Sequence, residues 1–228
     1  NAQCTLLGPY KIPNYYSEFN AVFTNKPIVT PYRGAGRQHG VFVIERLLDL
    51  AAKELGLDRA EIRRRNFLQP ADFPYDNQII YQDFTNLVYD SGNYEPSLDR
   101  ALEMIGYREF IQEIQPQARK QGRSLGIGVV AYVEGTGIGP YEGARVQVQQ
   151  SGKVSVATGV GTQGQGHFTS FAQIAADQLG VDIEQVQVIT GDTDQFHWGT
   201  GTFASRGAGV AGNAVNEAAK DVRENILR

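Results

Sequence analysis

The sequence contains few residues of the kinds that form covalent or metal-mediated cross-links. Among 228 residues there is one cysteine, Cys4, and there are three histidines, at positions 39, 167 and 197. A single cysteine excludes an internal disulfide, a cysteine zinc site and a cysteine-bound iron–sulfur cluster within this chain. It also indicates a reducing compartment, which we expect to be the cytoplasm. The histidines lie far apart, so we expect hydrogen-bonded or surface residues and predict no metal site.

Several other functional signals are missing. No apolar run approaches the roughly 18 residues of a membrane span, so we expect no transmembrane helix. The net charge of −4, without a basic stripe interleaved with aromatic residues, argues against binding to nucleic acid. There is no GxxxxGK(S/T) phosphate loop, no nucleophile elbow and no Ser-His-Asp order. The sequence therefore contains no recognisable catalytic group.

Glycine is the residue in excess, with 26 copies that lie in loops rather than in repeats. The densest stretch is "GVGTQGQGH" (Gly159–His167), with four glycines in nine residues. A second stretch, "GTGTFAS" (Gly199–Ser205), adds two threonines and a serine. Stretches of this kind let the backbone approach a bound group closely.

The first half of the chain predicts mainly helices joined by irregular segments. Apolar residues at helical spacing predict a helix from Gly40 that ends at Gly56, and Asp58 followed by Glu61 caps a second helix to about Asn66. Ser97 is expected to cap another helix, and a further one should run from Tyr107 until Pro116 disturbs it. The remaining parts are expected to be short strands and turns (residues 5–37) and a polar, aromatic loop (residues 67–93).

The second half changes to alternating strands and helices. Alternating valines on both sides of Ser151-Gly152 predict a β-hairpin, and a strand is expected at Val186–Ile189. Helices are expected at Phe168–Leu179, which stops at Gly180, and at Ala211–Leu227. The order is strand, loop, helix, strand, loop, helix, and the fold class is α+β: mixed β-sheets with packed helices. Each glycine loop leads into a helix N-terminus.

This repeated arrangement predicts a site for a phosphorylated ligand. A helix N-terminus presents unpaired N–H groups and a partial positive charge, so it binds phosphate without any lysine. Gln163 and Gln165 add amides that donate and accept hydrogen bonds. The alternative is that both loops are tight turns. The GxGxxG spacing at Gly159–Gly164 follows a hairpin rather than a first strand, so we regard it as accidental, and Asp192 and Asp194 are expected to form Asx turns rather than a metal pair.

Taken together and in order, the motifs resemble a known family. They are "GPYKIPN" (Gly8–Asn14), "TPYRGAGR" (Thr30–Arg37), "EIRRRNF" (Glu61–Phe67), "SGKVSVATGVGTQGQGH" (Ser151–His167), "ITGDTD" (Ile189–Asp194) and "GTGTFASR" (Gly199–Arg206). This set resembles the large subunit of the molybdenum hydroxylases, the group of xanthine dehydrogenase, aldehyde oxidase and carbon monoxide dehydrogenase. The resemblance covers almost the whole chain.

The resemblance implies a molybdenum–pterin cofactor, in bacterial members usually molybdopterin cytosine dinucleotide, that lies between glycine-rich loops. The metal is then bound by pterin sulfurs and non-protein oxygen and sulfur ligands, which agrees with the lack of a metal-ligating cluster here. The cofactor-binding residues it implies are Gly164, Gln165 and Gly166 in the first loop, Thr202, Ala204 and Ser205 in the second, and Arg33 close to the metal. The alternative for Arg33 is a structural salt bridge.

The resemblance also places a substrate pocket at Gly34, Ala35, Glu134 and Ile138. Gly34 stands where the copper-containing carbon monoxide dehydrogenase has a copper-binding cysteine, so a copper site is not expected. Ala35 stands where xanthine dehydrogenase has a phenylalanine that packs on planar substrates, which implies a different or roomier pocket. The implied substrate is an aldehyde, an N-heterocycle or an aromatic compound.

Two features of the family are absent from these residues: an earlier glycine-rich segment and a late Gly-Glu motif with the general-base glutamate. The chain therefore resembles a middle segment of the large subunit. It would comprise the end of a first molybdopterin-binding domain (residues 1–125) and the start of a second (residues 126–228), and would be inactive alone. Its partners would be the rest of the large subunit and the subunits or domains with [2Fe–2S] clusters and FAD. The alternative is a natural split subunit, or an assembly module without its own catalysis.

Overall fold

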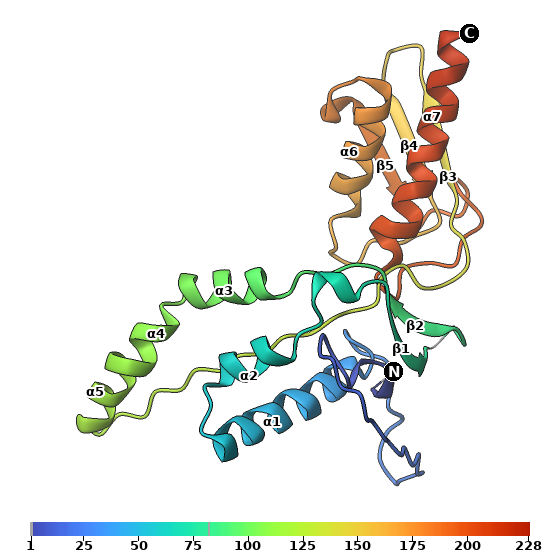
Figure 1. Cartoon of the computed structure of the whole chain (residues 1–228). Helices are drawn as coiled ribbons and strands as arrows, with labels where there is room; N and C mark the ends of the chain where they lie inside the picture. Colours follow the sequence, from blue (N-terminus) through green and yellow to red (C-terminus); the bar gives the residue numbers. More distant parts are fainter. Residues whose placement is uncertain (1, 82) are drawn as a thin grey trace. The chain divides into compact units, whose positions relative to one another are not determined.

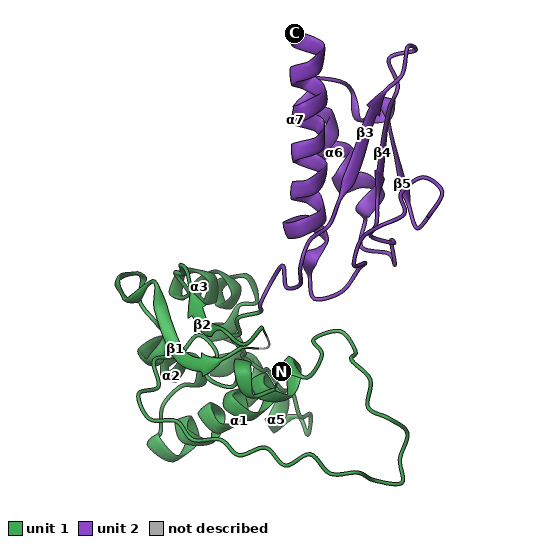
Figure 2. Ribbon diagram, turned by 90° about the vertical axis from the view of Figure 1, so that its right-hand side faces the viewer, with its two compact units in different colours: residues 1–134 green, residues 135–228 purple. Residues whose placement is uncertain are grey.

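The structure is a computed structural model that describes residues 2–81 and 83–228. The chain divides into two compact units, residues 1–134 and 135–228, coloured separately in Figure 2. The α+β fold class is confirmed, because a two-stranded sheet in the first unit and a three-stranded sheet in the second are each combined with helices. The predicted domain boundary at residues 125/126 concerns the family's domains and stays a prediction.

The first unit is largely helical (Figure 1). Its elements are α1 (Arg37–Leu55), α2 (Arg59–Asn66), β1 (Tyr75–Ile80), β2 (Asn86–Tyr89), α3 (Glu95–Met104), α4 (Tyr107–Glu109), a π-helical turn (Phe110–Ile114) and α5 (Gln115–Lys120). The predicted helix ends are confirmed at Gly56, which caps α1 with φ of 64°, and at Asp58, whose carboxylate accepts the N–H groups of Ala60 and Glu61. The hydrophobic spacing therefore located α1 and α2 correctly.

Four predictions for this unit were wrong. Residues 5–37 contain no strand beyond the single bridge between Tyr10 and Phe67. The supposed loop at residues 67–93 contains the antiparallel pair β1–β2, whose irregular register hides the alternation that would reveal strands. Helix α3 starts at Glu95, so Ser97 lies inside it. Pro116 does not end its helix, because a π-helical turn (Phe110–Ile114) precedes it and the helix continues through α5 to Lys120.

A buried polar network centred on Glu45 connects four segments of the first unit. The Tyr10 hydroxyl donates to Glu45 Oε1 over 2.5 Å, Arg63 Nε donates to Glu45 Oε2 over 2.7 Å, and the N–H of Ala131 reaches Oε2 over 3.2 Å. Burial, and then the bond to Glu45, raise the pKa of Tyr10 well above its ordinary value. The surrounding core consists of Tyr10, Ile44, Ala60, Phe67, Leu98, Tyr107 and Val129.

The second unit is a three-stranded sheet packed against two long helices. β3 (Ala144–Val148) and β4 (Val154–Thr158) form the predicted antiparallel hairpin. β5 (Val186–Thr190) pairs with β4 in parallel, and α6 (His167–Leu179) lies in the connection between these two strands. A π-helical turn (Gly207–Gly212) leads into α7 (Asn213–Leu227). The predicted order of strands, loops and helices in this half is confirmed.

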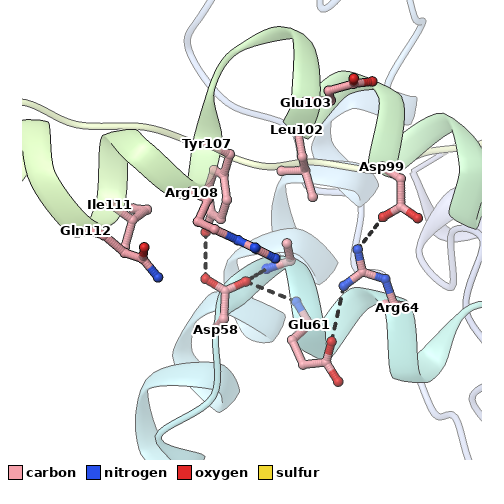
Figure 3. Close-up of a pocket in the computed structure, with 11 residues that line it drawn as sticks. Asp58, Glu61, Arg64, Asp99, Leu102, Glu103, Tyr107, Arg108, Ile111 and Gln112 are labelled. Atoms are coloured by element: carbon pink, nitrogen blue, oxygen red, sulfur yellow. Dashed lines mark hydrogen bonds and ion pairs between the residues drawn. The ribbon is translucent and has the colours of Figure 1, made fainter.

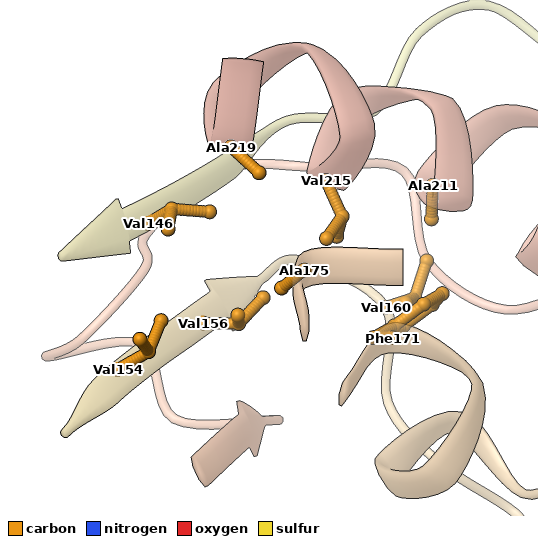
Figure 4. Packing of buried hydrophobic residues seen from close by; sticks show 9 residues of the cluster. All are labelled: Val146, Val154, Val156, Val160, Phe171, Ala175, Ala211, Val215 and Ala219. Atoms are coloured by element: carbon orange, nitrogen blue, oxygen red, sulfur yellow. The ribbon is translucent and has the colours of Figure 1, made fainter. Parts of the chain in front are cut away.

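The core of the second unit lies between the sheet and both helices (Figure 4). It is formed by Val146 of β3, Val154 and Val156 of β4, Val160, Phe171 and Ala175 of α6, and Ala211, Val215 and Ala219 around α7. Alanines on the helices let them approach the valine side chains of the sheet closely. This packing fixes where α6 and α7 begin, and therefore where the two glycine loops end.

His167, the first residue of α6, is a buried polar residue in this packing. It is 5% exposed, its ring stacks on Phe171 with centroids 5.1 Å apart, and its Nδ1 has no hydrogen-bond partner among the described residues. Burial lowers the pKa of His167, because charging the ring there would cost solvation energy. The expectation of a hydrogen-bonded or surface histidine is therefore wrong for His167.

Replacing Phe171, which is fully buried, by alanine should lower the free energy of unfolding by about 3–5 kcal/mol, because it removes a large side chain from the centre of the core. Chemical denaturation of the chain measures this change. Phe168→Ala is the matched control on the same helix, since Phe168 is 52% exposed, and it should change stability by less than about 0.5 kcal/mol. Equal effects for both variants would contradict this account of the core.

The buried His167 should also make stability pH-dependent. Its pKa is lower in the folded state than in the unfolded chain, so the unfolded chain binds the proton more readily. The stabilising contribution is complete above about pH 6.5 and is lost as the pH falls below that value. Between pH 7.5 and 5.5, His167→Gln should therefore lose less thermal stability than the wild type. The exposed His39 supplies the control, and a His39→Gln variant that matched His167→Gln would argue against burial as the cause.

Candidate functional site

The two glycine loops lie against each other in the second unit. We call residues 159–166 the first glycine loop and residues 199–205 the second glycine loop. A Cβ on Gly159 would be 2.3 Å from the carbonyl oxygen of Trp198 and 2.8 Å from Cα of Gly199. Only glycine permits this approach of the two backbones. The Thr202 hydroxyl also donates to the carbonyl oxygen of Gly161, so the structure brings the two predicted loops into direct contact.

The first glycine loop ends in an open helix N-terminus. Gly166 precedes α6 with φ of 80°, no side chain caps the helix, and its first turn contains no acidic residue. A Cβ at Gly164 or Gly166 would meet nothing within 4 Å. The side chain of Gln165 turns back onto the loop, where its Oε1 accepts the N–H of Gln163 over 2.6 Å. The partial positive charge of α6 therefore points into open space beside the loop.

The second glycine loop contains backbone strain at the predicted residues. Ala204 and Ser205 have φ of 48° and 54°, a left-handed conformation that side chains other than glycine disfavour. Ala35, another predicted residue, has φ of 48°. Strained residues of this kind persist where the surrounding structure holds them, and they are concentrated at ligand sites. Three of the predicted site residues are therefore strained, an observation that does not depend on the sequence motifs.

A buried ion pair borders the second glycine loop. Glu142 and Arg206 have side chains with 0% exposure and contact each other directly. Their Oε2 and Nε atoms have no hydrogen-bond partner among the described residues. Removing one member of such a pair typically costs about 3–5 kcal/mol, because it leaves a buried charge without compensation. Neither residue was expected from the sequence to be important, because nothing local in the sequence relates Glu142 to a residue 64 positions later.

The remaining predicted residues divide between the units. In the first unit, Arg33 is exposed and forms no ion pair with another described residue. Gly34 lies in the turn before α1, and Glu134 pairs with Arg37 in the first turn of α1 over 2.9 Å. In the second unit, Ile138 is flanked by two glycines. A Cβ on Gly137 would lie 3.9 Å from the Val210 side chain, and a Cβ on Gly139 would lie 3.2 Å from the Phe203 ring.

The described residues contain no group of three or more histidine, cysteine, aspartate or glutamate side chains that could hold a metal ion. Asp192 Oδ1 accepts the N–H groups of Asp194 over 3.0 Å and of Gln195 over 3.4 Å, as an Asx turn does. The predicted Asx turn is confirmed for Asp192. No helix in the described part of the chain is both long enough and apolar enough to cross a membrane.

A hollow of about 580 Å³ lies elsewhere, beside α2, α3 and α4 of the first unit (Figure 3). Several of its polar residues bond to one another: Arg64 bonds to Glu61 and Asp99, and the Tyr107 hydroxyl donates to Asp58 over 2.8 Å. Burial, together with this bond, raises the pKa of Tyr107 to about 12. None of the predicted site residues lines this hollow. Its polar contacts connect α2 to α3 and α4, which is a structural role.

Comparisons with known proteins assign the chain to a family. The chain matches two models described as molybdopterin cofactor-binding domain, at residues 1–67 and 100–228. It is 36% identical over 98% of its length to the 6-hydroxypseudooxynicotine dehydrogenase complex subunit gamma of Paenarthrobacter nicotinovorans. It is also 36% identical over 94% of its length to the carbon monoxide dehydrogenase large chain of Hydrogenophaga pseudoflava. In both cases it spans 28% of the relative's length.

A solved structure is similar along nearly the whole chain. Quinoline 2-oxidoreductase from Pseudomonas putida 86 superposes with a TM-score of 0.90 and 38% sequence identity, over 99% of this chain and 29% of that protein. The family models, the relatives and this structure agree on the assignment that the ordered motifs implied. The chain belongs to the molybdopterin cofactor-binding domains of the molybdenum hydroxylases and is a segment of their large subunit.

Proposed function

We propose that the two glycine loops of the second unit hold the pterin and phosphates of molybdopterin cytosine dinucleotide in an enzyme that hydroxylates a small organic substrate. The observation that carries the proposal is the direct contact of the two loops at Gly159 and Gly199. Two loops so close to each other can bind one large ligand together.

The residues present suit this ligand. The open N-terminus of α6 provides N–H groups and a positive partial charge for phosphate oxygens. The free space at Gly164 and Gly166 lets a planar group approach the backbone. Ala204 and Ser205 have left-handed backbone conformations, which contribute to concave groups of N–H donors that bind anions. Each of these features favours an anionic, hydrogen-bonding cofactor over an apolar ligand.

The bound molybdenum centre would supply the two-electron oxidation and oxygen transfer to the substrate. The residues of this chain would bind and orient. Gln165 would donate a hydrogen bond from its amide, and Thr202 would accept one at its hydroxyl oxygen, because its proton is already donated to Gly161. Arg33 would place a permanent positive charge beside the reacting centre. The general base is expected outside these residues, so this segment alone would not turn over substrate.

We propose an N-heterocyclic compound as the first substrate class to test, ahead of other aromatic compounds and aldehydes. The names of similar proteins support this order, since they include a quinoline oxidoreductase and a nicotine 6-hydroxylase. Gly34 and Ala35 leave the turn before α1 without a bulky or thiol side chain, which favours a roomy pocket and disfavours copper.

The partners proposed for the complete enzyme are the rest of the large subunit and the parts that contain [2Fe–2S] clusters and FAD, in the cytoplasm. A similar protein is a subunit of a dehydrogenase complex, which supports a multi-subunit enzyme. A natural split subunit remains the alternative, and a reading frame that continues past both ends of this segment would exclude it.

The double variant Gly164→Ala/Gly166→Ala in the complete large subunit should lower bound molybdenum and released cytidine monophosphate at least fivefold. Alanine at φ of 102° and 80° is strained by about 1–2 kcal/mol per residue, and its Cβ occupies the space that the ligand needs. Both contents are measured per mole of protein.

Gly152→Ala is the matched control for this variant. Gly152 has φ of 83° and open space around it, but it lies in the turn between β3 and β4. It should retain wild-type cofactor content. Unchanged content in the double variant would defeat the proposed role of the first glycine loop.

Arg33→Ala in the complete enzyme should reduce turnover per bound molybdenum at least tenfold, because it removes the charge beside the reacting centre. Turnover is measured with an N-heterocyclic compound that the wild-type enzyme oxidises. Arg46→Ala is the control, since Arg46 is an exposed arginine of α1 that pairs with Asp49. An Arg33→Ala enzyme with the wild-type rate would show that Arg33 has no such role.

A further inference from the structure

The guanidinium of Arg206 holds the start of the second glycine loop at several points. Nη2 donates to the carbonyl oxygen of Tyr141 over 2.8 Å, and Nη1 donates to that of Gly201 over 3.0 Å. Nη1 also contacts the Thr200 hydroxyl and Glu142 Oε1, and the guanidinium carbon lies 4.9 Å from the centre of the Phe203 ring. One buried side chain therefore contacts three residues of the loop.

Glu142 completes this arrangement from the opposite direction. Its Oε1 accepts the N–H of Thr200 over 2.9 Å and the N–H of Gly201 over 2.8 Å. Its Oε2 lies close to both glycine backbones: a Cβ added to Gly199 would be 2.5 Å from this oxygen, and a Cβ added to Gly159 would be 3.1 Å from it. The carboxylate therefore fits between the two glycine loops at the point where their backbones meet.

We infer that Arg206, paired with Glu142, is a positioning residue that fixes the second glycine loop against the first and so sets the spacing of the cofactor contacts. This inference rests on the proposed function. Neither side chain reaches solvent, so neither touches the cofactor from the open side of the loops. They act through Gly201, Thr202 and the strained pair that follows. Hydrogen bonds from this buried pair hold the loop, so its left-handed residues keep a strained conformation that a free loop would leave.

The variant Arg206→Lys separates the positioning role of Arg206 from its charge. Arg206→Lys keeps a positive charge for Glu142, but an ammonium group cannot reproduce the planar fork that reaches two carbonyl oxygens at once. The first unit offers a matched control in Arg63, whose side chain has 0% exposure and pairs with Glu45 over 2.7 Å. Arg63→Lys makes the same chemical change at a buried pair that does not contact a glycine loop.

The experiment measures amide hydrogen exchange and cofactor release in the complete large subunit. With Arg206→Lys, we expect exchange at residues 159–166 and 199–205 and release of molybdenum and cytidine monophosphate to become at least tenfold faster. With Arg63→Lys, both rates should stay within twofold of wild type, even if this variant lowers the melting temperature as much as Arg206→Lys does. Thr200→Val keeps the ion pair but removes one hydroxyl from the network. It should accelerate both rates about threefold, and it serves as the test if Arg206→Lys does not fold.

Wild-type exchange of the loops in Arg206→Lys, or equal acceleration by Arg63→Lys, would overturn the inference. Faster exchange with unchanged cofactor release would also overturn it, because the loop would then be fixed without effect on the cofactor. A wild-type subunit without molybdenum or cytidine monophosphate would instead refute the proposed function, and with it a role of Arg206 toward the cofactor. The exchange rates would still show whether Arg206 fixes the loop.

Discussion

The close approach of two backbones at Gly159 and Gly199 is the constraint on which the candidate site depends. It places a loop that follows β4 beside a loop that follows β5, and the parallel pairing of these strands makes the approach possible. The helices packed on the sheet then fix where each loop ends. A buried carboxylate and guanidinium occupy the junction, where hydrophobic side chains could not satisfy the N–H and carbonyl groups of both loops. The site is therefore a product of sheet topology as much as of glycine content.

The first unit uses its motifs differently. Tyr10 of "GPYKIPN" stacks on Phe67 of "EIRRRNF" with centroids 5.5 Å apart, and Arg63 of the latter motif binds Glu45. These two motifs therefore serve packing and a buried polar network. The turn in "TPYRGAGR" is different, since Arg33 is exposed and Ala35 is strained. Motifs that support one family assignment thus form a packed, hydrogen-bonded core in one place and an exposed, strained turn in another.

Local patterns predicted the regular elements with strong signals. Period-two valines identified the β3–β4 hairpin, and Gly56 and Gly180 marked the ends of α1 and α6. The weak elements were missed. β1 and β2 lack clean alternation, and the helix around Pro116 continues because a π-helical turn precedes it. The candidate site was predicted residue by residue from the ordered motifs, but its supporting pair was not, because a contact between Glu142 and Arg206 leaves no periodic trace.

The sequence by itself determined the strongly patterned helices and strands, where glycine is required, and which family the chain belongs to, because these depend on local chemistry and on the order of motifs. The tertiary structure alone decided that the two glycine loops touch, that His167 is buried, and that Glu142 and Arg206 form one buried pair. It also decided that Glu134 pairs with Arg37. Contacts of this kind join residues far apart in the chain, and their free energy depends on burial and geometry that arise only when the sheet and helices pack together.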